Sequence, residues 1–329
     1  MSATHTMTDH NRTAERPPSH ARWMPAVRFA AVGIGSIFAA LASVAALTVA
    51  EGFWVRGRLL PSRTEDPEAT RGLFGQQHPG PPLNLVLMGD SLAVGYGSED
   101  PTETVGVILA NELAELSERP VQLENVARVG AESIDLLVQL GAVRGFSSRP
   151  DVAVIIVGAN DAMHLRPLNE SLGALRTTIT ELRGMGAQVV LASCPDLGTV
   201  RPFFEPLRYF AHWLSRLLAT SQTIVALRAG ARTVSLADSL GALFRQDPGT
   251  MFSQLDHLHP SARGYRHAAE VLLPSVRAAA GYPTGDGRFV PHRVYDKNSR
   301  HPLAWLAFRA SRRAGMRLRH SRGVTTASA

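Results

Sequence analysis

The chain has 329 residues, which allows one large domain with appendages or two modest ones. Charged residues make up 19% and hydrophobic residues 45%, an ordinary globular mixture that excludes wholesale disorder, and the single cysteine, Cys194, excludes both an internal disulfide framework and a zinc site built on paired cysteines. The net charge is +6, but residues 283–329 hold ten Lys and Arg against two Asp, so the remainder is slightly acidic and binding to nucleic acid is not expected.

The N-terminal 50 residues divide into two parts. Residues 1–28 are polar, and we expect them to be disordered. Residues 29–50 carry no charge and are long enough to cross ~30 Å of hydrocarbon, so they predict an N-terminal transmembrane helix. A cleaved signal sequence is the alternative, because small residues at 48–50 offer a cleavage site. Arginines lie on both sides of the segment, so its orientation is not determined.

Two further segments flank the predicted folded domain. Residues 51–82 contain two adjacent prolines and several glycines, which is typical of a linker. Residues 283–329 form a basic tail in which Leu, Trp and Phe alternate with Arg. This pattern fits either an interfacial helix on anionic lipid or a solvated terminus.

Short apolar runs alternate with helical patterns through residues 83–282. The expected strands are Leu83–Met88, Val121–Val126, Val152–Val157, Gln188–Ala192 and Thr233–Leu236. The expected helices are Val105–Leu116, Ile134–Val143, Leu172–Met185, Leu207–Ala229 and Ala262–Ala280. This alternation predicts a three-layer α/β/α domain with a five-stranded parallel sheet. Ligands of such sheets bind beyond the carboxyl ends of the strands, and the chemistry is therefore expected there.

A serine follows the first expected strand directly. The run Gly89-Asp90-Ser91-Leu92 places a hydroxyl after a glycine that permits a sharp turn. Alone, the run is more typical of a helix cap than of a nucleophile. It is not a phosphate-binding loop, because no Gly-Lys-Ser/Thr follows.

A serine nucleophile needs a base, and the base needs a group that orients it. Asp256 and His259 stand three residues apart before the last expected helix, a spacing that lets one loop bring the carboxylate to the imidazole. Asp238 is a weaker candidate for the orienting role. His257 and His259 could instead bind a metal, but no third ligand is evident nearby.

Hydrogen-bond donors for an oxyanion are expected at the same edge of the sheet. The third strand runs into Gly158-Ala159-Asn160-Asp161, which supplies an amide side chain. The second strand runs toward Gly130, which could supply an unobstructed backbone N–H. Each has a plain structural reading, as a turn residue and a helix-entry glycine. Together with Ser91 and the Asp-x-x-His run, they form an ordered set at strand ends.

On these residues the chain resembles the SGNH (GDSL-type) hydrolases, over about 200 residues, 83–282. With its apolar N-terminal segment and arginine-dominated basicity, it is similar to the exported GDSL esterases and lipases of actinobacteria. The resemblance implies a flavodoxin-like fold and carboxylic ester hydrolysis without a cofactor or metal. It also implies a domain outside the cytoplasm, either membrane-anchored or secreted.

The resemblance further implies a role for each motif residue. Ser91 would be the nucleophile, His259 the general base and then acid, and Asp256 the orienting carboxylate. The Ser91 and Gly130 N–H groups and the Asn160 side chain would form the oxyanion hole. An acyltransferase or a carbohydrate O-deacetylase could use the same residues, and a non-catalytic envelope-binding protein could retain the fold. The natural substrate is not encoded by these motifs.

Overall fold

The computed structural model describes residues 43–44, 46–47, 50 and 69–282. Within residues 69–282, six strands form one sheet in the order β1-β3-β2-β4-β5-β6. The strands are β1 (Gly72–Phe74), β2 (Leu83–Gly89), β3 (Val121–Asn125), β4 (Val152–Ile156), β5 (Gln188–Ser193) and β6 (Arg232–Ser235). All neighbouring pairs are parallel except β1 and β3.

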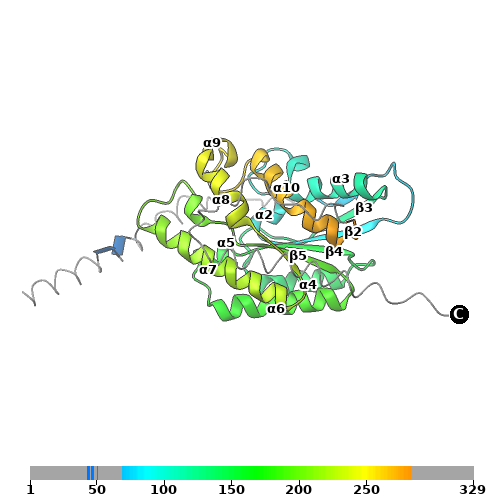
Figure 1. Ribbon diagram of the computed structural model, residues 1–329, viewed down its shortest axis with the longest axis horizontal. Coiled ribbons are helices and arrows are strands. Elements are labelled where there is room, and N and C mark those ends of the chain that lie inside the picture. The colour runs from blue at the N-terminus through cyan, green and yellow to red at the C-terminus, as the bar shows by residue number, and fades with distance from the viewer. Residues whose placement is uncertain (1–42, 45, 48–49, 51–68, 283–329) are drawn as a thin grey trace, which may run out of the picture. The chain divides into compact units, whose positions relative to one another are not determined.

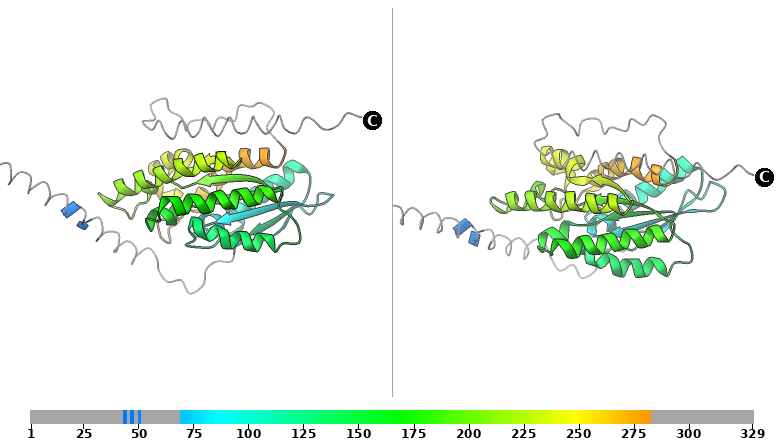
Figure 2. Two further views of the ribbon diagram at one scale, coloured as in Figure 1. Left: turned by 90° about the horizontal axis from the view of Figure 1, so that it is seen from below. Right: turned by 60° about the horizontal axis from the view of Figure 1, so that its bottom comes forward.

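Helices connect the strands, as the predicted alternation requires. The longer helices are α3 (Val105–Ser117), α4 (Leu136–Arg144), α6 (Leu168–Gly184), α7 (Leu207–Arg228), α8 (Leu236–Gln246) and α10 (Ala262–Ala279). The short helices are α2 (Ser91–Val94), α5 (Ala159–Met163) and α9 (Pro248–Met251), with 3-10 turns η2 (Pro101–Glu103), η3 (Ser133–Asp135) and η4 (Leu197–Thr199). Figures 1 and 2 show helices on both sides of the sheet, which makes the three layers.

Two apolar cores lie on the two faces of the sheet. Leu85 and Leu87 of β2 face a core shared with α3, α8 and α10, whereas Val86 and Met88 face one shared with α4, α6 and α7. β4 alternates in the same way and is buried along its whole length. A strand covered on both faces requires apolar residues at every position, which explains its unbroken run of apolar residues.

The prediction of a five-stranded, wholly parallel sheet is wrong by one strand. β1 pairs antiparallel with β3, with Leu73 opposite Gln122, and makes the sheet mixed and six-stranded. It lies inside the segment 51–82 that was interpreted as a linker. A strand of three residues is too short to show a hydrophobic period in the sequence. Its pairing depends on β3, which is distant in the sequence.

Three predictions fall wholly or largely outside the described residues. The expected disordered segment 1–28 and the basic tail 283–329 are described at no position, and the expected transmembrane segment, 29–50, at only five. Among the residues that are described, no helix is both long and apolar enough to cross a membrane.

The strand order fixes where a ligand crevice can form. The chain starts the parallel sheet at β2, adds β3 on one side and then β4 on the other. Connections leaving adjacent strands in opposite directions open a crevice at their carboxyl ends. Ser91 follows β2 and Asn160 follows β4, so both lie at this crevice.

Candidate active site

Ser91 is held at the turn between β2 and α2. Gly89 makes the turn with φ +130°, and a Cβ there would lie 1.8 Å from the Ile156 carbonyl oxygen, so only glycine fits. Asp90 then caps α2, its carboxylate accepting a hydrogen bond of 3.0 Å from the Leu92 N–H. The Gly-Asp-Ser run is therefore both a helix cap and the support of a serine hydroxyl.

A chain of hydrogen bonds joins Ser91 to residues far along the sequence. His259 Nε2 lies 2.8 Å from Ser91 Oγ, and His259 Nδ1 lies 2.6 Å from Asp256 Oδ2. A carboxylate can only accept, so the Nδ1–H donates to Asp256 and leaves Nε2 to accept the Ser91 proton. The structure thus brings together the three residues that the sequence predicts for nucleophile, base and orienting group.

Asp256 remains ionised in this setting. Partial burial of the carboxyl opposes ionisation, but the hydrogen bond and charge of His259 and two backbone N–H groups outweigh it, and the pKa of Asp256 lies below its ordinary value. Those N–H groups, from Leu258 and His259, both donate to Oδ1 at 3.0 Å. Since Oδ1 fixes the loop and Oδ2 fixes the ring, one carboxylate holds His259 in both position and orientation.

Two residues that the sequence analysis did not single out pack against His259. The Tyr96 ring lies 4.6 Å from the imidazole, centroid to centroid. Gly97 has φ +91°, and a Cβ there would come within 2.9 Å of His259 Cβ. Gly95 and Gly97 do not have the spacing of a dinucleotide-binding fingerprint. Two glycines so close together after Ser91 are the sequence signal that the backbone here passes close to another part of the protein.

The predicted oxyanion donors lie on two adjacent loops. Gly130 is exposed, with φ +78°, in the turn that follows β3, and Asn160 is buried at the start of α5. Asn160 Nδ2 donates to the Ala131 carbonyl at 3.0 Å, which ties the two loops together and fixes the amide. Ser91, Gly130 and Asn160 all line the same cavity.

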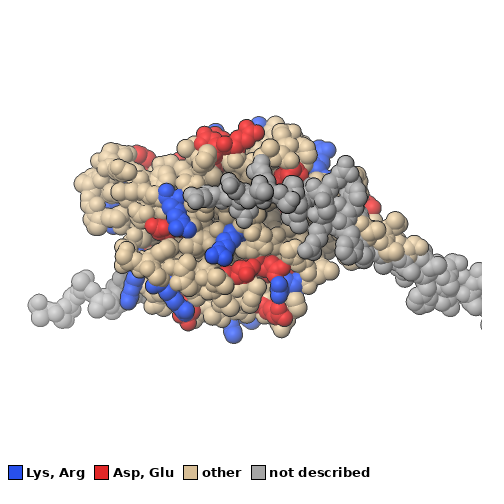
Figure 3. Space-filling model, turned by 180° about the vertical axis from the view of Figure 1, so that it is seen from behind, with Lys and Arg blue, Asp and Glu red and all other residues tan. Residues whose placement is uncertain are grey.

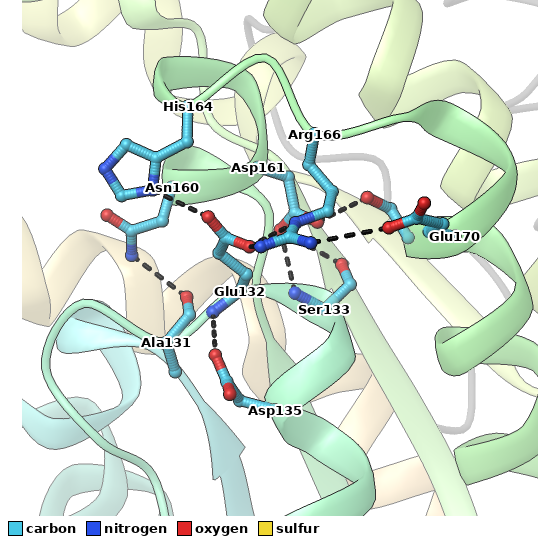
Figure 4. A network of polar contacts seen from close by, with 10 residues as sticks. Ala131, Glu132, Ser133, Asp135, Asn160, Asp161, His164, Arg166 and Glu170 are labelled. Atoms are coloured by element: carbon cyan, nitrogen blue, oxygen red, sulfur yellow. Dashed lines mark hydrogen bonds and ion pairs between the residues drawn. The ribbon is translucent and has the colours of Figure 1, made fainter.

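A buried carboxylate beside these loops was not predicted. Glu132 Oε1 lies 2.7 Å from His164 Nδ1, and Oε2 pairs with the Arg166 guanidinium (Figure 4). Arg166 also reaches Glu170 Oε2 at 3.4 Å. Glu132 thereby joins the loop that carries Gly130 to the segment that follows Asn160. Because the His164–Glu132 pair spans 32 residues of sequence, no local pattern could predict it.

Asp90 is wholly buried next to Ser91 in the chain. Burial raises its pKa to about 7, against the opposing effect of the Leu92 N–H and with a further increase from the charge of Asp161. Between about pH 4 and 7 the Asp90 carboxyl is therefore protonated in the folded protein, whereas the same carboxyl is ionised in the unfolded chain. The stability that the neutral carboxyl contributes is complete below about pH 4 and is lost as the pH rises through about 7.

Asp90→Asn should remove this pH dependence. Relative to the wild type, its free energy of unfolding is expected to increase by up to roughly 4 kcal/mol between pH 4 and 8, because the amide stays neutral. Urea denaturation at four pH values measures the difference. The control is Asp100→Asn, at an exposed carboxyl whose pKa is lowered by hydrogen bonds from Thr102. If the free energies of unfolding of Asp90→Asn and the wild type differ by the same amount at every pH, the raised pKa of Asp90 is contradicted.

Other candidate residues have structural partners. Asp238 accepts from Arg216 at 2.8 Å and from Ser235, so the alternative orienting group is bound elsewhere. Cys194 is fully buried, and burial raises the pKa of its thiol. His257 is exposed in the left-handed region. Among the described residues, no group of three His, Cys, Asp or Glu is placed to hold a metal ion.

A cavity of about 120 Å³ opens beside the Ser91 hydroxyl. Its lining includes Ser91 and His259 and continues along apolar side chains of α8 and α10. Asp196, which also lines it, is fully buried and paired with Arg245 at 2.8 Å and His212 at 2.9 Å. The Ser91 hydroxyl therefore lies at a cavity whose lining is mostly apolar.

The surface charge is mixed on the face opposite to that of Figure 1. Lys and Arg side chains alternate there with Asp and Glu, and the described residues on that face show no broad patch of one sign (Figure 3). Such a surface produces no strong field of one sign.

The three-layer α/β/α fold, with Ser91, His259 and Asp256 in one hydrogen-bonded chain, defines a protein of the SGNH hydrolase fold. A family model for the GDSL-like lipase/acylhydrolase family matches residues 87–267, more than half of the chain. The chain belongs to this family.

The chain is similar to one relative by sequence and to two esterases of known structure. The GDSL-like esterase Rv1075c of Mycobacterium tuberculosis is 39% identical over 197 residues, covering 60% of this chain and 62% of that protein, so the match spans less than two thirds of the curated relative. The psychrotrophic esterase EstA from Pseudoalteromonas sp. is 20% identical, with 59% and 96% coverage and a TM-score of 0.46. Axe2, an acetylxylan esterase from Geobacillus stearothermophilus, is 18% identical, with 62% and 97% coverage and a TM-score of 0.44.

Proposed function

We propose that this protein is a serine-dependent carboxylic ester hydrolase, an esterase or lipase, with Ser91 as nucleophile, His259 as general base and acid, and Asp256 as orienting carboxylate. The observation that carries the proposal is the 2.8 Å approach of His259 Nε2 to Ser91 Oγ, with Nδ1 held at 2.6 Å by Asp256. This arrangement activates a hydroxyl that is otherwise a poor nucleophile at neutral pH. Membership of an acylhydrolase family supports the same conclusion.

The reaction proceeds in two halves. Ser91 Oγ attacks the ester carbonyl while His259 takes the hydroxyl proton, and the oxyanion accepts hydrogen bonds from the Ser91 and Gly130 N–H groups and Asn160 Nδ2. Collapse breaks the bond to the alcohol, which leaves with the proton from His259. Water, deprotonated by His259, then attacks the acyl-serine ester, and the carboxylic acid is released with Ser91 restored.

Asn160→Ala tests the oxyanion hole. Loss of one preorganised donor is expected to lower kcat by about 10²–10³ with little change in KM, because the donor acts mainly on the charge that develops in the transition state. Hydrolysis of nitrophenyl esters measures both constants. Asn84→Ala is the matched control, because Asn84 lies at the end of β2 that is remote from Ser91. Its kcat and KM should stay near those of the wild type. An Asn160→Ala enzyme with full kcat would remove Asn160 from the mechanism.

Acyl transfer by the same residues is the second candidate function. Both functions share the acyl-serine step and differ in whether water or an acceptor hydroxyl attacks it. Product analysis separates them: hydrolysis releases one free acid for each alcohol, whereas transfer yields an acylated acceptor and less free acid. The proposal predicts equal amounts of acid and alcohol. A persistent deficit of acid when a sugar or lipid alcohol is added would favour the transferase.

A further inference from the structure

We propose that the cavity beside Ser91 holds the acyl chain of the ester, and that it fits an unbranched chain of about six carbons, carbonyl carbon included. The inference rests on the proposed function, because the chain enters as part of the ester whose carbonyl lies at Ser91. It adds the substrate class, which the motif residues do not encode. Esters of short to medium fatty acids are favoured over acetylated sugars.

The cavity joins a reactive end to an apolar end. Ser91 and His259 line it together with apolar residues of several elements. These apolar residues include Val105, Ile156, Leu236, Leu240, Phe244 and Leu272. A sugar hydroxyl placed among such side chains would lose its hydrogen bonds to water without replacement, whereas a methylene chain loses none. The apolar lining therefore selects the acyl side of the ester.

The volume of the cavity sets the length of the chain. A dry cavity of about 150 Å³ holds benzene, which has six carbons. The 120 Å³ found here accordingly holds about five carbons beyond the carbonyl. Each methylene that is buried should raise kcat/KM by about fourfold at most, and the gain should stop where the chain no longer fits.

Gly241 is the position that leaves this space open. Three other positions of α8 that line the cavity carry large apolar side chains, Leu236, Leu240 and Phe244, whereas Gly241 has none. A Cβ at Gly241 would lie 3.4 Å from Asp196 Oδ2 and from the Arg245 guanidinium, which is ordinary contact. Alanine is therefore compatible with the backbone, and a longer side chain at this position would compete for the cavity that both Gly241 and Asp196 line.

The test compares the hydrolysis of nitrophenyl acetate, hexanoate and hexadecanoate by the full-length chain. The wild type should favour hexanoate over acetate by at least tenfold in kcat/KM, and hexadecanoate should be poor. Gly241→Leu should reduce the hexanoate-to-acetate ratio at least tenfold, and Gly241→Ala should reduce it less. The control Gly173→Leu makes the same change inside α6, where a Cβ meets nothing within 4 Å, and should leave the ratio unchanged.

Each contrary result has a distinct meaning. An unchanged ratio in folded Gly241→Leu, with circular dichroism like that of the wild type, would overturn the inference. A wild type that prefers acetate would also overturn it while leaving ester hydrolysis in place. Absence of turnover with every ester, or turnover that survives Ser91→Ala, would instead refute the proposed function. If Gly241→Leu does not fold, the ratio of Gly241→Ala decides, because alanine is a better helix former than glycine.

Discussion

Replacing Ser91 by alanine should lower ester turnover by about 10⁴–10⁶, the loss typical of removing the nucleophile of such a hydrogen-bonded triad. The fold should be unaffected, because the helix cap at this turn is made by the Asp90 carboxylate and the Leu92 N–H and does not involve the serine hydroxyl. The measurement is steady-state hydrolysis of a nitrophenyl ester by the two full-length proteins, purified in parallel.

The matched control for this substitution is Ser98→Ala. Ser98 lies seven residues further along the chain, in the loop after α2, and its hydroxyl donates to the Asp100 carbonyl at 2.9 Å. Its loss should leave turnover within about twofold of the wild type, as is usual for a group outside the reacting atoms. Equal losses in both variants, or substantial turnover by folded Ser91→Ala, would show that the hydroxyl of Ser91 is not the nucleophile.

Asp256→Asn is expected to lower kcat by roughly 10⁴-fold, a smaller loss than the upper limit expected for Ser91→Ala. The amide keeps a carbonyl oxygen for the Leu258 and His259 N–H groups, so the loop should keep its shape. It presents an NH₂ group to Nδ1, however, which stabilises the tautomer with the proton on Nε2 and leaves no acceptor for the Ser91 proton. Steady-state hydrolysis of a nitrophenyl ester, measured at several pH values between 6 and 9, gives the change in kcat.

Asp238→Asn is the corresponding control for the orienting carboxylate. Asp238 is paired with Arg216 in the structure, so its replacement should leave kcat within a few-fold of the wild type. If instead Asp238→Asn lost most of the activity and Asp256→Asn retained it, the orienting role would have to be reassigned to Asp238.

The five parallel strands and the proximity of the candidate site residues could be predicted because both have local signals. β4 is an unbroken apolar run, which identifies a strand covered on both faces. Ser91 and Asn160 directly follow strands, and parallel strands end at the same edge, so their proximity follows from topology. The spacing of Asp256 and His259 is itself local, and the structure places both side chains in contact.

The remaining features depend on contacts between distant segments. β1 exists because β3 offers an edge 50 residues away in the chain, and three residues carry no period of their own. The expected strand Thr233–Leu236 ends one residue earlier, at Ser235, whose side chain caps α8, a helix that the pattern analysis did not resolve. The cavity is lined by residues from many elements, from α2 through to α10, so neither its size nor the role of Gly241 could be predicted from the sequence.

The most direct test of the central claim is covalent labelling of the wild type by a nitrophenyl phosphonate ester, followed by intact mass measurement and peptide mapping. The account predicts one phosphonyl group per chain, attached to Ser91 Oγ, with ester turnover lost in proportion to labelling. Pre-incubation with a slowly hydrolysed ester should delay the reaction. Labelling at another residue, or continued turnover after Ser91 is fully modified, would contradict the assignment of Ser91 as the nucleophile.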